Sequence, residues 1–150
     1  MTDPRFEPCS AMLLAGIRCH HDLQAAPQQV PAQWEAFHAT PLRQTQAVTY
    51  GVTCSFDAAT QRLEYMCAVE VSSFDEVPEG TGRLRVPDML CAVFPHVGPP
   101  HDIPATWGRA MHWLASNGRW EDAHMPNFER YDERMQCEIW LPVRESRVQG

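Results

Sequence analysis

The segment Phe128-Glu129-Arg130-Tyr131 combines a carboxylate with aromatic rings at a spacing that suits ligand binding. On a strand, Glu129 and Tyr131 would share one face, while Phe128 and Arg130 would point to the other. A lipophilic cation loses hydration when it leaves water, and a carboxylate with nearby aromatic faces compensates that loss. The alternative is that Glu129 is a solvated acid on an edge strand.

Other aromatic residues could complete such a site. Two tryptophans, Trp34 and Trp107, occupy equivalent places on two expected helices, and we expect them to pack between helix and sheet. Four more aromatic residues lie in expected strands, where each could either line a ligand groove or belong to the core: Tyr50, Tyr65, Phe94 and Trp140.

The sequence contains few candidates for catalytic residues or metal ligands. His96 could act as an acid or base, but a histidine at a strand end is more often structural. All 12 basic residues are arginine, which excludes lysine Schiff-base chemistry, and neither a glycine-flanked serine nucleophile nor a glycine-rich phosphate loop occurs. The segment Cys19-His20-His21 is the closest candidate for a metal site, but neighbouring residues on a strand point to opposite sides and cannot bind one ion together. We therefore expect no catalytic residue, metal site or cofactor.

A repeated pattern positions these residues. The segments 30–34 (VPAQW) and 103–107 (IPATW) are near copies, and each has a proline suited to the first turn of a helix. We expect helices near 31–39 and 103–117. In the second helix, Trp107, Ala110, Met111 and Leu114 should form one apolar face.

Strand patterns recur around both expected helices. Each helix is preceded by one apolar run and followed by two extended segments, which gives two strand-helix-strand-strand halves at about 11–73 and 86–144. We expect an α+β fold with antiparallel sheets, a pseudo-two-fold (SHS2-like) relation between superposable halves and a ligand groove at their junction. The expected strands are 11–17, 48–56, 62–69, 89–94, 128–131 and 134–141.

Length and composition limit the class of protein. A chain of 150 residues with 44% hydrophobic residues is expected to form one globular domain over 1–150. The net charge of −7 disfavours direct nucleic-acid binding. No apolar stretch approaches a membrane span, the opening residues lack a secretory pattern, and the six cysteines form no C-x-x-C pair. We expect a cytoplasmic protein.

The order and spacing of several motifs resemble the GyrI-like small-molecule-binding domain, which is also the effector-binding part of many AraC-type and MerR-type multidrug regulators. The resemblance covers about 11–144. This chain has Cys67-Ala68 where family members usually have glycine, and the larger side chains would narrow the floor of the groove slightly. It implies a groove that binds aromatic, often cationic, molecules, with Glu129 meeting the cation. We expect no helix-turn-helix with this domain, because ten residues precede the first expected strand. The matching segments are 63–71, 86–98, 113–114, 126–131 and 137–143.

Three functions are consistent with these observations. We expect a stand-alone protein that binds lipophilic cationic or aromatic small molecules, for sensing or sequestration, with a protein partner or homodimer possible. The first alternative is a hydrolase of strained cyclopropane-containing natural products, which the resemblance also implies and which would use Glu129 with Tyr65 or Trp140. The second is a protein-interaction module such as a gyrase inhibitor, for which a charge of −7 is modest.

Overall fold

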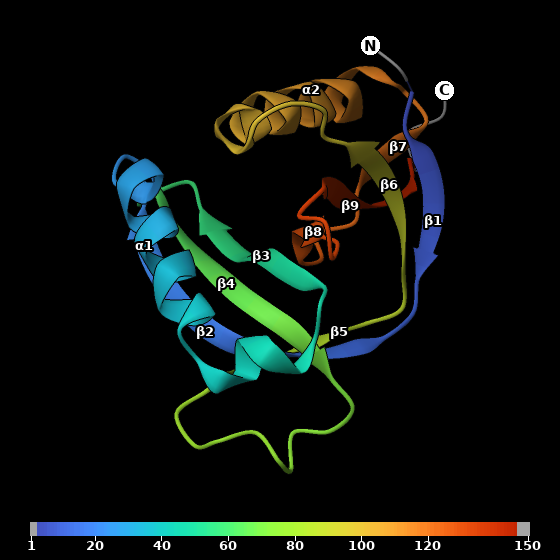
Figure 1. The fold of residues 1–150 in the computed structure, drawn as a ribbon. Coiled ribbons are helices and arrows are strands. Elements are labelled where there is room, and N and C mark those ends of the chain that lie inside the picture. The colour runs from blue at the N-terminus through green and yellow to red at the C-terminus, as the bar shows by residue number, and fades with distance from the viewer. Residues whose placement is uncertain (1–2, 147–150) are drawn as a thin grey trace.

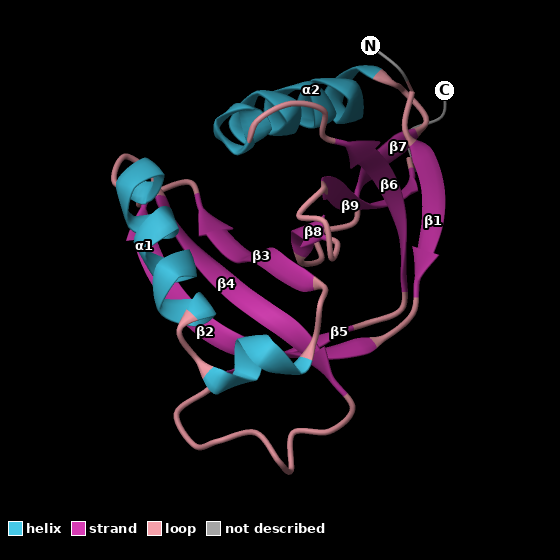
Figure 2. Ribbon diagram, viewed as in Figure 1, coloured by secondary structure: helices cyan, strands magenta, loops and turns pink. Residues whose placement is uncertain are grey.

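The structure, a computed structural model, describes residues 3–146, which form a mixed α+β fold with a large antiparallel sheet and two long helices (Figures 1 and 2). No helix in this range is long and apolar enough to span a membrane. The elements in chain order are β1 (Arg5–Cys9), β2 (Met12–Asp22), α1 (Ala26–His38), η1 (Pro41–Thr45), β3 (Thr49–Asp57), β4 (Arg62–Val71), β5 (Gly82–Val86), β6 (Met89–Pro95), η2 (Pro100–Asp102), α2 (Ile103–Ser116), β7 (Trp120–Asp122), β8 (Asn127–Tyr131) and β9 (Cys137–Glu145).

The sheet is strongly curled, and each of its edge strands, β1 and β5, continues along the chain into a strand near the opposite edge. Its strand order is β1-β6-β9-β8-β3-β4-β2-β5, with β7 paired to β9 outside this order. Cys9 pairs with Met89, and Met12 pairs with Val86, so two residues interrupt each strand and the register continues across the gap. β1 with β2, and β5 with β6, therefore behave as two long bent strands that run side by side.

The curled sheet has an inner and an outer face. The inner face buries a core to which most of the strands contribute, including Leu14, Val52, Met66, Val93 and Phe128. α1 packs on the outer face against β2 and β4, and α2 packs against β7 and β9 on the same face (Figure 1). The halves meet where β3 pairs with β8, so a side chain on the outer face of β8 lies between the two helices.

Both halves have the same order of elements and equivalent strand pairing. The first half has the neighbours β2-β4-β3, and the second has β6-β9-β8, with β7 as an addition. The two ladders between β1 and β6 and between β2 and β5 then join the halves. That the halves superpose as copies of one unit stays a prediction.

The helices differ from expectation in two details. α1 begins at Ala26, because Pro27 takes the first-turn position, and Pro31 lies inside the helix, so the expected start near residue 31 is wrong. α2 begins and ends close to the expected residues. Met111 is 45% exposed, whereas Thr106 is buried in its place, so the expected apolar face is only partly correct.

Candidate functional site

Glu129 lies at the centre of the outer face, at the junction of the two halves. It is directly opposite Gly51 of β3 on one side and Ile139 of β9 on the other. Because side chains opposite one another share a face, Glu129 is placed on the side that carries both helices. The alternation expected from the sequence therefore positions this carboxylate between α1 and α2.

Three side chains from three elements donate hydrogen bonds to the Glu129 carboxylate. Oε1 accepts from the hydroxyl of Tyr65 on β4 at 3.0 Å and from that of Tyr131 on β8 at 2.7 Å. Oε2 accepts from the indole Nε1 of Trp107 on α2 at 2.7 Å. Trp34 of α1 joins this group by donating from Nε1 to the Tyr65 hydroxyl at 3.2 Å. We call these five residues the Glu129 cluster.

The cluster is a cage of aromatic rings around a carboxylate. The ring centroid of Trp34 lies 5.4 Å from that of Tyr131 in an edge-to-face arrangement. Tyr65 is 6% exposed, while the other four members keep more accessible surface, so the cluster can be reached from outside. Aromatic faces near a carboxylate are the groups that attract an organic cation.

Burial controls the protonation of the cluster. Loss of solvent raises the pKa of Glu129 above its ordinary value of 4.5, and the hydrogen bonds from Trp107, Tyr131 and Tyr65 oppose this rise. Burial and the charge of Glu129 raise the pKa values of Tyr65 and Tyr131, so both phenols remain protonated donors. The cluster can therefore change its charge at Glu129 while its tyrosines stay neutral.

A glycine makes room for the central contact. A Cβ atom on Gly51 would lie 2.0 Å from the Tyr65 hydroxyl oxygen and 2.9 Å from Oε1 of Glu129. Any larger residue at this position would push the two groups apart. Gly51 is therefore part of the site although it carries no functional group.

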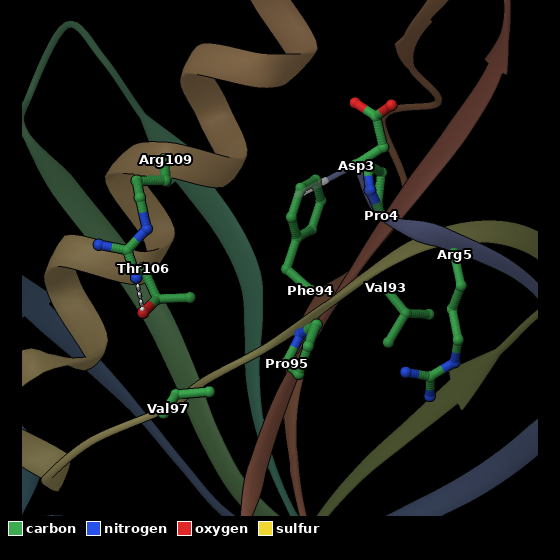
Figure 3. A pocket seen from close by; sticks show the side chains of 9 residues that line it. All are labelled: Asp3, Pro4, Arg5, Val93, Phe94, Pro95, Val97, Thr106 and Arg109. Carbon is green, nitrogen blue, oxygen red and sulfur yellow. Dashed lines mark hydrogen bonds between the residues drawn. The ribbon is translucent and has the colours of Figure 1, made fainter. Parts of the chain in front are cut away.

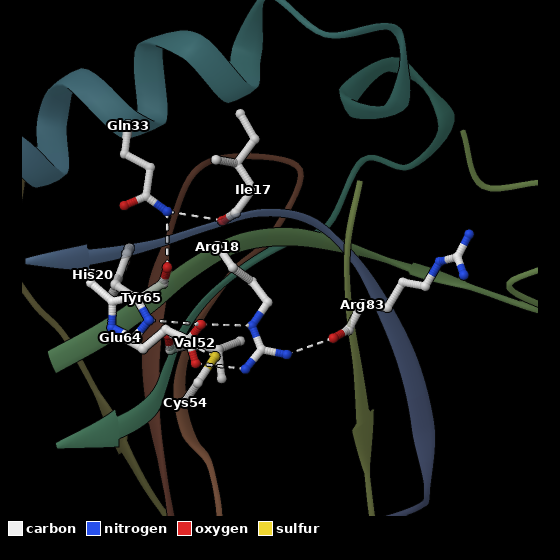
Figure 4. Close-up of polar contacts among 9 residues, drawn as sticks. All are labelled: Ile17, Arg18, His20, Gln33, Val52, Cys54, Glu64, Tyr65 and Arg83. Carbon is white, nitrogen blue, oxygen red and sulfur yellow. Dashed lines mark hydrogen bonds and ion pairs between the residues drawn. The ribbon is translucent and has the colours of Figure 1, made fainter. Parts of the chain in front are cut away.

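Gln33 fastens α1 to the strands below the cluster. Its Nε2 donates to the carbonyl oxygens of Ile17 at 2.9 Å and of Tyr65 at 3.0 Å (Figure 4). Its Oε1 lies 2.6 Å from Nε2 of the buried His21. The bond to the Tyr65 backbone ties the helix that carries Trp34 to the strand that carries the Tyr65 hydroxyl.

The sequence profile of the GyrI-like small molecule binding domain matches residues 2–144. The chain belongs to the GyrI-like family. The matched region includes all five residues of the Glu129 cluster. A search of curated protein sequences finds no match to this GyrI-like chain.

Solved structures with the same fold include ligand-bound and enzyme-named proteins. SAV2435 bound to tetraphenylphosphonium has a TM-score of 0.79 and 18% identity, with 95% of this chain and 94% of that chain covered. An integron cassette protein from the mobile metagenome of Vibrio cholerae has a TM-score of 0.77 and 15% identity, with 95% and 96% covered. A hydrolase from Listeria innocua has a TM-score of 0.54 and 11% identity, with 95% and 92% covered. At these identities the likeness shows a shared fold.

The structure brings together three of the six residues expected to bind ligand in this GyrI-like chain: Glu129, Tyr65 and Tyr131. Phe94 lies on the same outer face but farther along, beside α2, where its ring is 5.6 Å from that of Trp113.

Tyr50 and Trp140 lie on the opposite face from the Glu129 cluster. Both belong to the inner core, where their rings lie 5.4 Å and 5.6 Å from the ring of Phe128. These two aromatics therefore serve packing, because their strand positions alternate with those of the outer face.

Trp34 and Trp107 have a hydrogen-bonding role that the sequence analysis did not predict. They pack between helix and sheet as expected, but their indole N–H groups also bond within the Glu129 cluster. A buried indole N–H needs an acceptor, and this requirement was the available signal that they belong to a polar site. Trp107 therefore donates to Glu129 directly, and Trp34 donates to the Tyr65 hydroxyl that bonds to Glu129.

His96, which the sequence suggested to be structural, and His21, part of the Cys19-His20-His21 segment, both have defined partners. His96 Nε2 lies 2.9 Å from the carbonyl oxygen of Pro99, and Nδ1 lies 2.7 Å from the hydroxyl of Thr106. His21 is buried between the side chains of Gln29 and Gln33. Among residues 3–146, no group of three His, Cys, Asp or Glu side chains is placed to hold a metal ion.

Proposed function

We propose that this protein binds lipophilic, cationic, aromatic small molecules at the Glu129 cluster, with sensing or sequestration as the outcome. The observation that carries the proposal is the Glu129 carboxylate surrounded by Trp34, Tyr65, Trp107 and Tyr131. Family membership and the fold shared with SAV2435, which is bound to tetraphenylphosphonium, support it.

The geometry supplies both parts of cation recognition. The partly exposed rings of Trp34 and Tyr131 offer apolar surface and cation–π contact, and Glu129 offers the opposite charge. The three donors hold the carboxylate in place before a ligand arrives. A fixed carboxylate lowers the ordering cost of binding, which favours affinity without any cofactor.

Tetraphenylphosphonium binding measured by isothermal titration calorimetry tests this proposal. Glu129→Gln keeps the shape of the side chain, and its amide can still bond to the rotatable phenol hydroxyls and to Trp107. We expect a loss of about 1–3 kcal/mol in binding free energy for the cation and little change for neutral triphenylphosphine oxide.

Glu133→Gln is the matched control, because it removes the same charge from an exposed position in the nearby turn. It should leave cation affinity nearly unchanged. Equal losses in the two variants would show that Glu129 is remote from the ligand, and equal losses for the cation and the neutral compound would show that Glu129 supports structure or is remote from the site.

Hydrolysis is the second candidate function. A carboxyl with a raised pKa, hydrogen-bonded to two phenols, has the properties of a general acid or base, and a hydrolase from Listeria innocua shares the fold. We expect binding without turnover when the protein is incubated with ester, amide and cyclopropane-bearing substrates and products are followed by mass spectrometry. Turnover above one equivalent that is abolished by Glu129→Gln or Tyr65→Phe would favour the hydrolase.

A further inference from the structure

A cavity beside α2 is lined by Thr106 and Arg109 of the helix (Figure 3) and lies on the other flank of α2 from the Glu129 cluster. Trp107 faces Glu129, and Arg109, two residues later, is about 200° around the helix and lines this cavity. The cavity measures about 460 Å³, within the range that accepts drug-sized ligands. Phe94 and Pro95 of β6 also line it.

Arg109 gives this cavity a positive charge that no acid in the described part of the chain neutralises. Its Nη2 donates to the hydroxyl oxygen of Thr106 at 2.8 Å, and no described residue accepts from its Nε or Nη1. The other arginine of the cavity, Arg5, is already paired with Glu138 at 2.6 Å and with Glu7. Nε, Nη1 and the second N–H of Nη2 of Arg109 therefore remain free for a ligand.

Thr106 holds the guanidinium of Arg109 in position. It is 3% exposed, and its hydroxyl lies 2.7 Å from Nδ1 of His96, whose Nε2 lies near the carbonyl oxygen of Pro99. A carbonyl accepts only, so Nε2 of His96 carries a proton and donates to Pro99. The Thr106 hydroxyl is thus fixed by His96 on one side and accepts from Arg109 on the other.

The remaining lining residues suit an apolar body. Phe94 and Pro95 lie between Arg109 on one side and Arg5 on the other, and Val97, which is 85% exposed, stands at the edge (Figure 3). Asp3 also lines the cavity, and its carboxylate is directed away from Arg109 (Figure 3).

We propose that this cavity binds a small organic anion whose carboxylate accepts from the free N–H groups of Arg109 and whose apolar body lies against Phe94 and Val97. Nη2 shares one edge of the planar guanidinium with Nε and the other with Nη1, so the edge that Thr106 leaves unused presents two parallel N–H groups to the two oxygens of a carboxylate. The site is independent of the proposed cation site, because it uses other residues and the opposite charge.

Benzoate titration followed by NMR chemical shifts of the full chain tests this site. We expect saturable shifts at residues around Phe94, and Arg109→Gln should weaken binding roughly 10- to 100-fold, as expected for a charge-assisted hydrogen bond. Asp3→Asn should tighten binding, because it removes a nearby negative charge. Arg134→Gln, the matched control in the exposed β8–β9 turn, should have no effect.

Two further probes separate this site from others. Neutral benzamide should bind much more weakly than benzoate, and Glu129→Gln should leave benzoate affinity unchanged. The proposal is overturned if benzoate gives no saturable shifts, if Arg109→Gln and Arg134→Gln behave alike, or if benzamide binds as well as benzoate.

Discussion

In the Glu129 cluster, one residue carries the charge and its neighbours hold that charge in position. Trp107 and the two tyrosines satisfy its oxygens, so the charge is oriented without a ligand. The motif containing Glu129 and Tyr131 was readable from the sequence, because both residues lie on one strand. Tyr65, Trp34 and Trp107 come from other elements, and their convergence depends on distances that no local pattern encodes.

Protonation of Glu129 should make stability depend on pH. The folded protein raises the pKa of this carboxyl above 4.5, so it holds the proton more tightly than the unfolded chain. This stabilisation is complete below the ordinary pKa and is lost as the pH rises through the raised value. Relative to Glu129→Gln, the wild-type protein should lose free energy of unfolding across that window, as measured by urea denaturation from acid to neutral pH.

Cation affinity should change in the opposite direction over the same window. Ionised Glu129 attracts tetraphenylphosphonium, so affinity should rise with pH in the wild type and stay flat in Glu129→Gln. Parallel pH profiles for the two proteins, in stability or in binding, would contradict a titrating Glu129.

Gly51 offers a test of the space beside the carboxylate. Gly51→Ala would place a methyl group 2.0 Å from the Tyr65 hydroxyl, so that hydroxyl must leave Glu129. We expect a destabilisation of about 1–3 kcal/mol in thermal or urea unfolding, together with weaker tetraphenylphosphonium binding. Gly108→Ala is the control, because no atom lies within 4 Å of its new methyl group. A Gly51→Ala protein as stable as Gly108→Ala would disprove this account.

At the scale of elements, the sequence predicted what depends on local periodicity. The expected α2 and the strands that flank both helices lie close to their observed positions, and Asn117 ends α2 with its amide on the carbonyl oxygens of Trp113 and Leu114. Short strands such as β1, β5 and β7 were missed, because they form through pairing with distant segments. Which face of the sheet Tyr50 and Phe94 occupy also depends on pairing with distant segments, so the sequence did not predict it.

Gln33 tests how α1 is held against the sheet. Gln33→Leu would remove the amide that bonds to two backbone carbonyls and to His21, so the carbonyl oxygens of Ile17 and Tyr65 would lose this donor and Nε2 of the buried His21 would lose this partner. We expect a loss of about 2–4 kcal/mol in the free energy of unfolding. Gln29→Leu, which removes the exposed partner of His21 on the same helix, should cost under about 1 kcal/mol. Similar costs for both would show that the Gln33 bonds to the sheet contribute little.

At the scale of the whole molecule, pairing between the halves is distributed around the sheet. The ladders β1–β6, β2–β5 and β3–β8 each join five residue pairs between the parts of the chain before and after residues 72–81. The Glu129 cluster spans the last of these ladders, with Trp34 and Tyr65 from the first half and the other members from the second. Neither half contains the complete Glu129 cluster.

Because three ladders join the two parts of the chain, the connector between β4 and β5 is not needed to hold them together. Residues 72–81 belong to no strand, and Gly80 lies exposed within them, so a cut there would sever the chain without breaking any strand pair. The two fragments would still be held by three ladders and a shared core. We therefore expect them to reconstitute by fragment complementation, with tetraphenylphosphonium promoting reassembly because each fragment supplies part of its proposed binding site.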